Sequence, residues 1–203
     1  MNLSDVGLLT LEHLELVIVG TFFGGLAGFL LAIWVRRRPR WAASFLGLAE
    51  VIQTIPGIAL LAFLLLALGL GNPPVYVALA LYAILPVLSN TYEGLQGVDP
   101  VYLAIGKGMG MTPGQIFRQI ELPIAFPVIL AGLRVALVTS IGIATIGVFV
   151  GGGGLGVLIF RGLQTIDIQT MLAGAIPAAL LAIVLEVGLS LLERRLARAT
   201  ASK

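Results

Sequence analysis

A small set of polar side chains lies within long apolar stretches of this chain, and these are the residues placed to do chemistry. They are Glu50, Gln53, Thr54, Asn90, Arg134, Thr139, Ser140 and, separately, Thr145 and Glu186. If the stretches cross a membrane, a central charge costs about 2.5–3.5 kcal/mol on insertion scales, so it needs a function or a partner. Serine and threonine can instead bond their own helix backbone. All of these residues except Thr145 and Glu186 are candidates for a substrate pathway. Glu50, Gln53 and Arg134 are equally candidates for polar contacts between helices.

No catalytic or metal-binding constellation is predicted. The chain has no cysteine, and its single histidine, His13, is expected at the surface near the end of a span. Gly151, Gly153 and Gly156 match G-x-G-x-x-G, but no predicted strand surrounds them, and the sequence holds no G-x-x-x-x-G-K-[ST]. These glycines predict a tight turn beneath an extracellular partner rather than a nucleotide site. Glu186 is expected simply to lie at the membrane interface.

The composition predicts an integral membrane protein. Hydrophobic residues make up 59% of the 203 residues, charged residues make up 11%, and the mean hydropathy is +1.07. Soluble domains carry about 25% charged residues, so this chain lacks the charge to cover a water-facing surface. The net charge is +2, and the basic residues lie at the ends of apolar stretches, where membrane topology accounts for them. The lipid bilayer is therefore an expected partner, and nucleic acid is not.

Five apolar stretches are each long enough to cross a bilayer as a helix of about 20 residues. They cover about 14–35, 45–70, 75–95, 123–150 and 171–192. The basic residues that we place in the cytoplasm are Arg36, Arg37, Arg38, Arg40, Lys107, Arg118, Arg194, Arg195, Arg198 and Lys203. Only Arg161 falls clearly outside. This asymmetry predicts an N-terminus outside the cell and a C-terminus in the cytoplasm, with residues 97–122 as a cytoplasmic loop.

Three glycines share one face of the first predicted span. Gly20, Gly24 and Gly28 lie four residues apart, which places them in a row along a helix. Small residues at this spacing let two helices approach closely. Packing inside the bundle is the favoured interpretation, and a contact face between two subunits is the alternative.

The stretch 98–134 contains the only long polar interruption of the chain. Gly108, Gly110 and Gly114 break it into short pieces, and Pro113 can start a helix at its first turn. In a chain with so few polar residues, a segment of this length is more than a connector requires. We predict a short helix that seats in a partner's groove and transmits a rigid-body movement to the flanking spans. A plain connector is the alternative.

The spacing of residues in this loop resembles that of permease subunits of binding-protein-dependent ABC importers. The family motif is Glu-Ala-Ala, then a glycine, then Ile-x-Leu-Pro. Gly110, Ile120, Leu122 and Pro123 match it, whereas Ala104-Ile105-Gly106 stand at the Glu-Ala-Ala positions, so the glutamate is missing. The residues that the resemblance assigns to contact with an ATPase are Ala104, Ile105, Gly106, Gly110, Met111, Ile116, Phe117, Ile120, Leu122 and Pro123.

Further segments are similar to the osmoprotectant branch of that family, the permeases for glycine betaine, carnitine, choline or proline betaine. They are Gln53-Thr54-Ile55-Pro56, Asn90-Thr91-Tyr92, Gly132-Leu133-Arg134 and Gly153-Gly154-Leu155-Gly156. The resemblance implies an all-α, five-span type I importer permease, with one transmembrane domain over residues 1–203, in a bacterial or archaeal cytoplasmic membrane. Related permeases carry other amino-acid-like substrates, so such a substrate is the alternative.

The resemblance also implies the partners of the chain. A type I importer joins such a permease to a second permease, identical or homologous, to two cytoplasmic ATPases that bind ATP and Mg²⁺, and to an extracytoplasmic substrate-binding protein. The chain is then expected to be a transport subunit without enzymatic activity or a cofactor of its own. A proton- or sodium-coupled carrier is the rival class, but it needs an intramembrane ionisable relay, for which Glu50 and Arg134 offer little. A purely structural scaffold would leave the loop unexplained.

Overall fold

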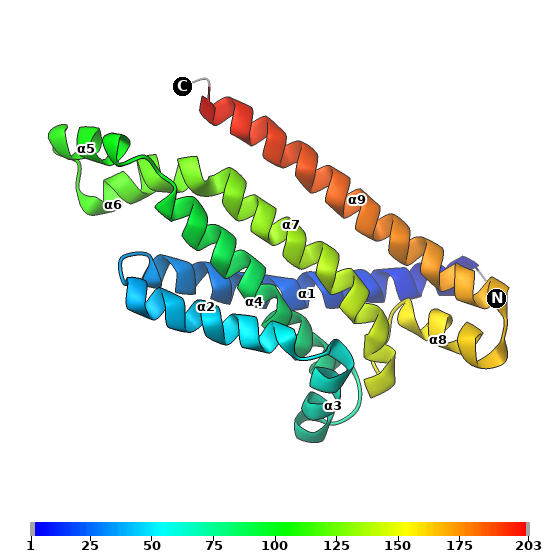
Figure 1. The fold of residues 1–203 in the computed structure, drawn as a ribbon. Helices are drawn as coiled ribbons and strands as arrows, with labels where there is room; N and C mark the ends of the chain where they lie inside the picture. The colour runs from blue at the N-terminus through cyan, green and yellow to red at the C-terminus, as the bar shows by residue number, and fades with distance from the viewer. Residues whose placement is uncertain (1–2, 202–203) are drawn as a thin grey trace.

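Four long helices form one elongated bundle in the computed structural model, which describes residues 3–201 and the side chains of residues 4–195. They are α1 (Leu3–Val35), α4 (Asn72–Gln96), α7 (Leu122–Ile146) and α9 (Ile168–Ala201), and they run lengthwise through the molecule (Figure 1). Every regular element within the described residues is helical. The all-α architecture that the family resemblance implies is confirmed, as is the set of long apolar helices that the composition predicts.

Helix α4 lies at the centre of the bundle. It packs against α1 and against α7, and α9 packs on α7 and α8. The contacts are filled by buried apolar side chains, which include Leu16, Val17, Leu61, Val75, Leu79 and Ala144. One polar pair is enclosed among them, because Thr21 Oγ1 of α1 donates to Ser140 Oγ of α7 at 2.8 Å. The pair satisfies both hydroxyl groups away from water.

Gly20, Gly24 and Gly28 form the seam between α1 and α4. A Cβ atom on Gly24 would lie 2.0 Å from the carbonyl oxygen of Ala80, and one on Gly28 would lie 2.7 Å from that of Ile84. No side chain fits there, because the two backbones are in contact. The prediction that these glycines pack inside the bundle is confirmed.

The predicted span over 45–70 is not one straight helix, because the chain bends sharply within it. Helices α2 (Pro39–Thr54) and α3 (Gly57–Leu68) meet at 96°. Pro56 has no N–H with which to continue the helix, and Ile55 before it takes an extended conformation, with φ −69° and ψ 123°. Within the described residues, four helices can each span a membrane, and the bent pair makes five spans if it counts as one.

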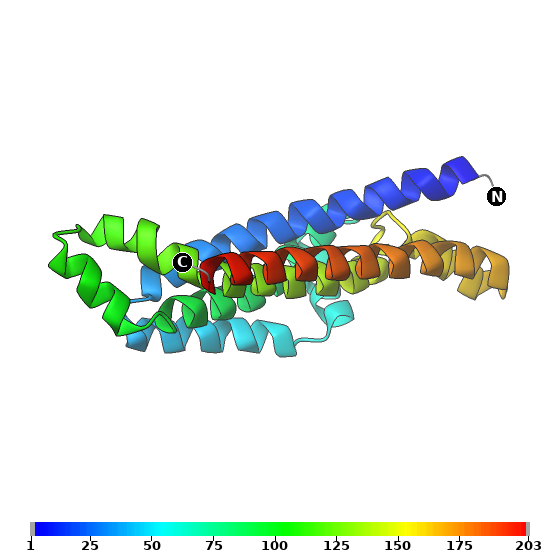
Figure 2. The same ribbon diagram turned by 90° about the horizontal axis from the view of Figure 1, so that it is seen from above.

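The two ends of the bundle carry different short helices. Helix α8 (Gly156–Thr165) lies at the end with the N-terminus, where α1 begins at Leu3 instead of near residue 14 as predicted. The predicted cytoplasmic loop lies at the opposite end with the C-terminus, and it is folded into α5 (Pro100–Gly108) and α6 (Pro113–Ile116) (Figures 1 and 2). A π-helical turn over Phe117–Glu121 joins α6 to α7, so the second half of that loop is continuous with the next span.

Candidate functional site

A hollow of about 610 Å³ lies at the bend between α2 and α3, with α4 and α7 as its other walls. Its lining residues are Gln53, Thr54, Ile55, Pro56, Gly57, Tyr82, Leu85, Pro86, Ser89, Asn90, Val135, Thr139, Gly142, Ile143 and Ile146. The volume falls within the range of small-molecule sites. The structure therefore brings together four of the residues predicted for a substrate pathway, namely Gln53, Thr54, Asn90 and Thr139. We refer to this space as the bend hollow.

Most polar side chains that line the bend hollow donate hydrogen bonds to backbone carbonyls, which leaves their own oxygen atoms free to accept. The side-chain amide of Gln53 donates to the carbonyl of Tyr82 at 3.0 Å, and that of Asn90 donates within α4 at 2.8 Å. The hydroxyl groups of Thr54, Ser89 and Tyr82 each donate to a backbone carbonyl, so their lone pairs remain. None of the lining side chains is charged. A small cation or zwitterion could be held here by dipoles without a fixed charge.

The bend adds backbone polar groups to this surface. Among the described residues, no backbone N–H donates to the carbonyls of Gln53 or Thr54, because Pro56 interrupts the helix. These carbonyls lie at the C-terminal, negative end of α2, and the N–H of Gly57 stays free at the start of α3. Discontinuous spans that line a cavity place backbone groups at transport sites in this way.

The other three predicted pathway residues lie elsewhere. Ser140 is buried against α1, and Glu50 is exposed on α2, outside the lining of the bend hollow. Arg134 of α7 forms ion pairs with two carboxylates of α9, Glu186 and Glu193, and the second joins Nε to Oε2 at 3.3 Å. Glu186 is expected from the sequence simply to lie at the membrane interface, and the structure adds that its side chain helps to tie α9 to α7.

Arg36, directly after α1, holds the folded loop against the bundle. Its Nη1 lies 2.8 Å from Oε2 of Glu121, and its guanidinium stacks on Phe117, 3.9 Å from the ring centroid. Gln96, at the end of α4, donates to the carbonyl oxygen of Arg36 at 2.7 Å. Burial lowers the pKa of Arg36 and the Glu121 carboxylate opposes that shift, but an arginine in a protein stays charged. We name Arg36, Glu121 and Phe117 together the arginine clamp.

The sequence carries only weak signals of the arginine clamp. Arg36 follows an apolar span directly, and Glu121 and Asp99 are the only acidic residues within 97–122. A carboxylate beside the start of an apolar run needs a partner. The partner lies 85 residues away along the chain, so only the tertiary structure identifies it.

Helix α5 has two different faces. Tyr102, Ile105 and Met109 are exposed by 53%, 54% and 76%, although all three are largely apolar. Leu103 and Lys107 line a hollow between the loop and the bundle instead. Exposed residues at positions i, i+3 and i+7 form a stripe of the kind that seats in a groove of another protein. We call these three residues the docking stripe.

The residues predicted to contact an ATPase divide between the surface and the interior of the loop. Ala104, Ile105, Gly110 and Pro123 are exposed; Met111, Phe117, Ile120 and Leu122 are half-buried; Gly106 and Ile116 are buried. A Cβ on Gly106 would lie 2.8 Å from Cδ1 of Ile120, so the loop has a small core of its own. Gly110 has φ +75°, a conformation that favours glycine.

The glycine turn after α7 lies at the other end of the bundle. Gly151 and Gly154 have φ +79° and +83°, which confirms the predicted tight turn. The N–H of Gly154 donates to Oε2 of Glu12 at 3.0 Å, and the N–H of Gly153 donates to Oδ1 of Asn72 at 2.9 Å. Helices α1 and α4 therefore hold this turn from within the chain.

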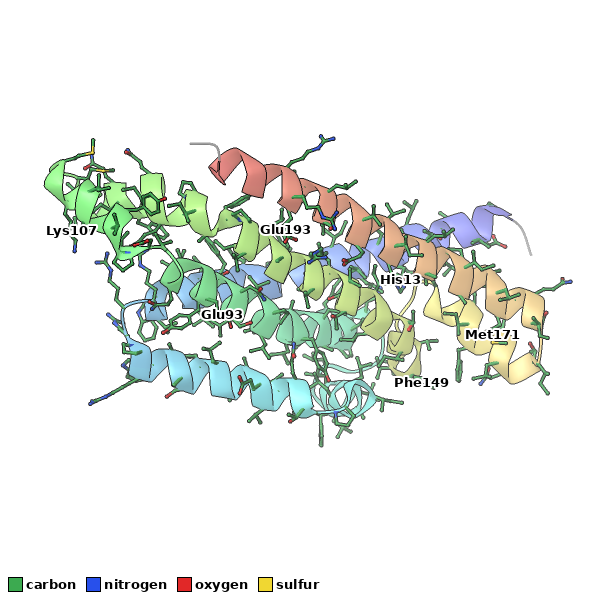
Figure 3. The ribbon with its side chains drawn as sticks, turned by 45° about the horizontal axis from the view of Figure 1, so that its top comes forward. His13, Glu93, Lys107, Phe149, Met171 and Glu193 are labelled. Atoms are coloured by element: carbon green, nitrogen blue, oxygen red, sulfur yellow. The ribbon has the colours of Figure 1, made fainter. Side chains whose placement is uncertain are left out.

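The prediction that His13 lies at the surface is wrong. The side chain is fully buried (labelled in Figure 3), and a Cβ on Gly154 would lie 3.0 Å from the Cα and Cβ atoms of His13. The cause is the outward extension of α1 beyond the predicted span, which places His13 inside the bundle instead of at its margin. A residue count from the apolar run alone could not reveal this extension.

Helices long and apolar enough to span a membrane surround an uncharged polar hollow, and a folded loop lies at one end of the bundle, which is the architecture of a membrane permease. The chain belongs to the family described as "Binding-protein-dependent transport system inner membrane component", whose sequence model matches residues 24–198. It is thus a transport component and a multi-pass membrane protein, and the family resemblance seen in the loop is confirmed.

Characterised relatives match nearly the whole chain. The choline transport system permease protein OpuBB of Bacillus subtilis (strain 168) is 42% identical over 187 residues, which cover 92% of this chain and 86% of that protein. The carnitine transport permease protein OpuCD of Listeria monocytogenes serotype 1/2a (strain 10403S) is 46% identical over 186 residues, which cover 91% and 83%. The predicted similarity to osmoprotectant permeases is confirmed.

A solved structure has the same fold. A chain from the study "Inward facing conformations of the MetNI methionine ABC transporter" superposes with a TM-score of 0.81, covering 97% of this chain and 99% of that one, at 22% sequence identity. Identity at this level supports a statement about the fold alone. The type I importer permease fold is thereby confirmed.

Proposed function

We propose that this chain is a permease subunit of an ATP-driven importer for a small quaternary ammonium osmoprotectant: glycine betaine, carnitine, choline or proline betaine. The observation that carries the proposal is the 42% and 46% identity to permeases for choline and carnitine over nine tenths of the chain. The bend hollow supports it, because a quaternary ammonium has no N–H to donate and is held by a diffuse negative field. An uncharged, oxygen-lined wall supplies such a field.

A second permease, identical or homologous, is proposed to complete the pathway. Gln53, Thr54, Pro56 and Thr139 line the bend hollow and are exposed in the single chain. A partner across this opening would enclose the substrate between two permeases. An extracytoplasmic binding protein would deliver the substrate at the end of the bundle that holds α8. The scarcity of aromatic residues, 7% of the chain, suggests that the binding protein supplies any aromatic cage.

Two cytoplasmic ATPases that bind ATP and Mg²⁺ are proposed to drive the cycle. The docking stripe on α5 is the surface proposed to seat on them. When ATP closes the ATPases, the loop is pulled, and the arginine clamp passes that movement to α1 and α7. The pathway then switches between inward- and outward-facing states as a rigid-body change. The chain itself needs no cofactor for this role.

The orientation that we propose places the N-terminus outside and the loop in the cytoplasm. Gln164 is an exposed residue in the last turn of α8, and a cysteine there should react with an impermeant thiol reagent added to intact cells. A cysteine at exposed Gln119 should react only after the membrane is opened. The chain has no cysteine of its own, so the background is clean. Labelling of Gln119→Cys from outside would contradict this orientation.

The substrate class is tested by competition. Cells that express this permease with its importer partners should take up labelled glycine betaine, choline or carnitine, and an excess of an unlabelled quaternary ammonium should reduce that uptake at least tenfold. Ordinary amino acids should have little effect, because their ammonium groups present N–H donors and a larger desolvation cost. Competition by amino acids but not by quaternary ammonium compounds would overturn the proposed substrate.

A further inference from the structure

A second hollow, of about 420 Å³, lies between the folded loop and the bundle. Arg36, Arg37, Lys107 and Glu121 contribute its charged groups. We propose that this hollow binds a phosphate group at the membrane surface, carried by a phospholipid headgroup or present as free phosphate. We name it the anion hollow. It is separate from the bend hollow, with which it shares no lining residue.

The charges of the anion hollow do not cancel. Glu121 pairs with Arg36 at 2.8 Å, which compensates one of the three cations. Arg37 is 3.9 Å from the same carboxylate and its side chain is 62% exposed, so it contributes little to that pair. Lys107 is exposed and forms no ion pair with any side chain that the structure describes. Two positive charges therefore remain at the hollow for an anion.

The position and the walls of the anion hollow favour a group that belongs to a lipid. Arg36 and Arg37 follow α1 directly, which places them where a span leaves the hydrocarbon. Apolar side chains from Leu95, Leu103 and Met111 line the same space. A basic pocket with apolar walls at a span end is a typical site for an anionic headgroup. Arginine can bind a phosphate through two N–H groups, and lysine adds a mobile point charge.

Binding here would leave the docking stripe free. Leu103 and Lys107 are four residues apart and share the face of α5 that lines the anion hollow. Tyr102 and Ile105 of the same helix, and Met109 directly after it, are exposed without lining the anion hollow. Figure 3 shows Lys107 projecting from α5 toward the side of the molecule that holds the turn between α1 and α2. A phosphate would therefore join the end of α1 to α5 without covering the stripe.

Native mass spectrometry of the full-length chain tests this inference. The chain is purified in detergent and titrated with phosphatidylglycerol and, in parallel, with phosphatidylcholine of the same acyl chains. We expect phosphatidylglycerol to bind more tightly than phosphatidylcholine. The double variant Arg37→Gln with Lys107→Gln should weaken the affinity for phosphatidylglycerol by about 30-fold, which is the usual contribution of two basic residues to the binding of an anionic lipid. The matched control is Arg40→Gln with Arg118→Gln, which removes the same charge from exposed residues outside the hollow and should keep the affinity.

A calorimetric titration with inorganic phosphate distinguishes the two sources of the group. Phosphate binding that is lost in Arg37→Gln with Lys107→Gln, without a preference for phosphatidylglycerol, would identify free phosphate as the ligand. A preference for phosphatidylglycerol without phosphate binding would identify the lipid. Unchanged unfolding temperatures of both double variants exclude misfolding as the cause. Equal loss in the control variant, or neither preference nor phosphate binding in the unaltered chain, would overturn the inference.

Discussion

Arg36→Ala is expected to uncouple ATP hydrolysis from uptake. The change leaves the Glu121 side chain, only 10% exposed, with Arg37 at 3.9 Å as its sole cationic neighbour among the described residues. Removing one partner of a buried ion pair costs about 3–5 kcal/mol, and the stacking on Phe117 is lost as well. Because the pair fastens the end of α1 to the start of α7, its loss should let the loop move without moving the spans. Uptake should fall at least tenfold while the ATPases stay bound.

This result is measured as uptake per ATP hydrolysed by the purified complex. Arg40→Ala is the matched control, because it removes an exposed arginine from the same segment without touching the arginine clamp. Arg36→Met with Glu121→Gln should avoid the stability cost of Arg36→Ala and give normal amounts of folded subunit, since a neutral pair leaves no buried charge. Wild-type coupling in Arg36→Ala would show that the clamp is only a structural contact.

Ile105→Asp with Met109→Asp is expected to detach the ATPases and to abolish uptake. Both side chains are more than half exposed in the single chain, so the double variant should fold and insert normally. In a complex, each carboxylate would be buried against an apolar groove without a partner, which costs several kcal/mol. The loss should appear as subunits that separate during purification in detergent.

Co-purification of the ATPases with the permease is the measurement for this variant. Ile105→Leu with Met109→Leu keeps the apolar area and should retain the complex. Stable co-purification and full uptake with both aspartates present would make the folded loop a plain connector.

The sequence alone predicted those features that depend on local pattern. The apolar runs located the long helices, the spacing of Gly20, Gly24 and Gly28 identified a close helix contact, and the loop motif identified the family. Pro113 and Gly110 do delimit a short helix and a positive-φ turn. Each of these features is set by neighbouring residues or by composition.

Features that depend on contacts between distant segments were missed. A sharp bend at Pro56 divides the apolar run 45–70. A proline alone does not predict such a bend, because Pro86, Pro127 and Pro177 lie within continuous helices. The partners of Arg36 and Arg134 lie 85 and 52 residues away, and polarity alone does not separate a paired charge from a pathway residue. The burial of His13 depends on how α1 meets the glycine turn.

Uptake into proteoliposomes tests the central claim most directly. The complex of this chain with the proposed second permease and ATPases is reconstituted with the proposed binding protein outside and ATP with Mg²⁺ at the ATPase face. We expect labelled glycine betaine, choline or carnitine to accumulate only when ATP can be hydrolysed, and a proton or sodium gradient to make no difference. Accumulation that follows an imposed ion gradient without ATP would contradict the account and would make the chain a secondary carrier.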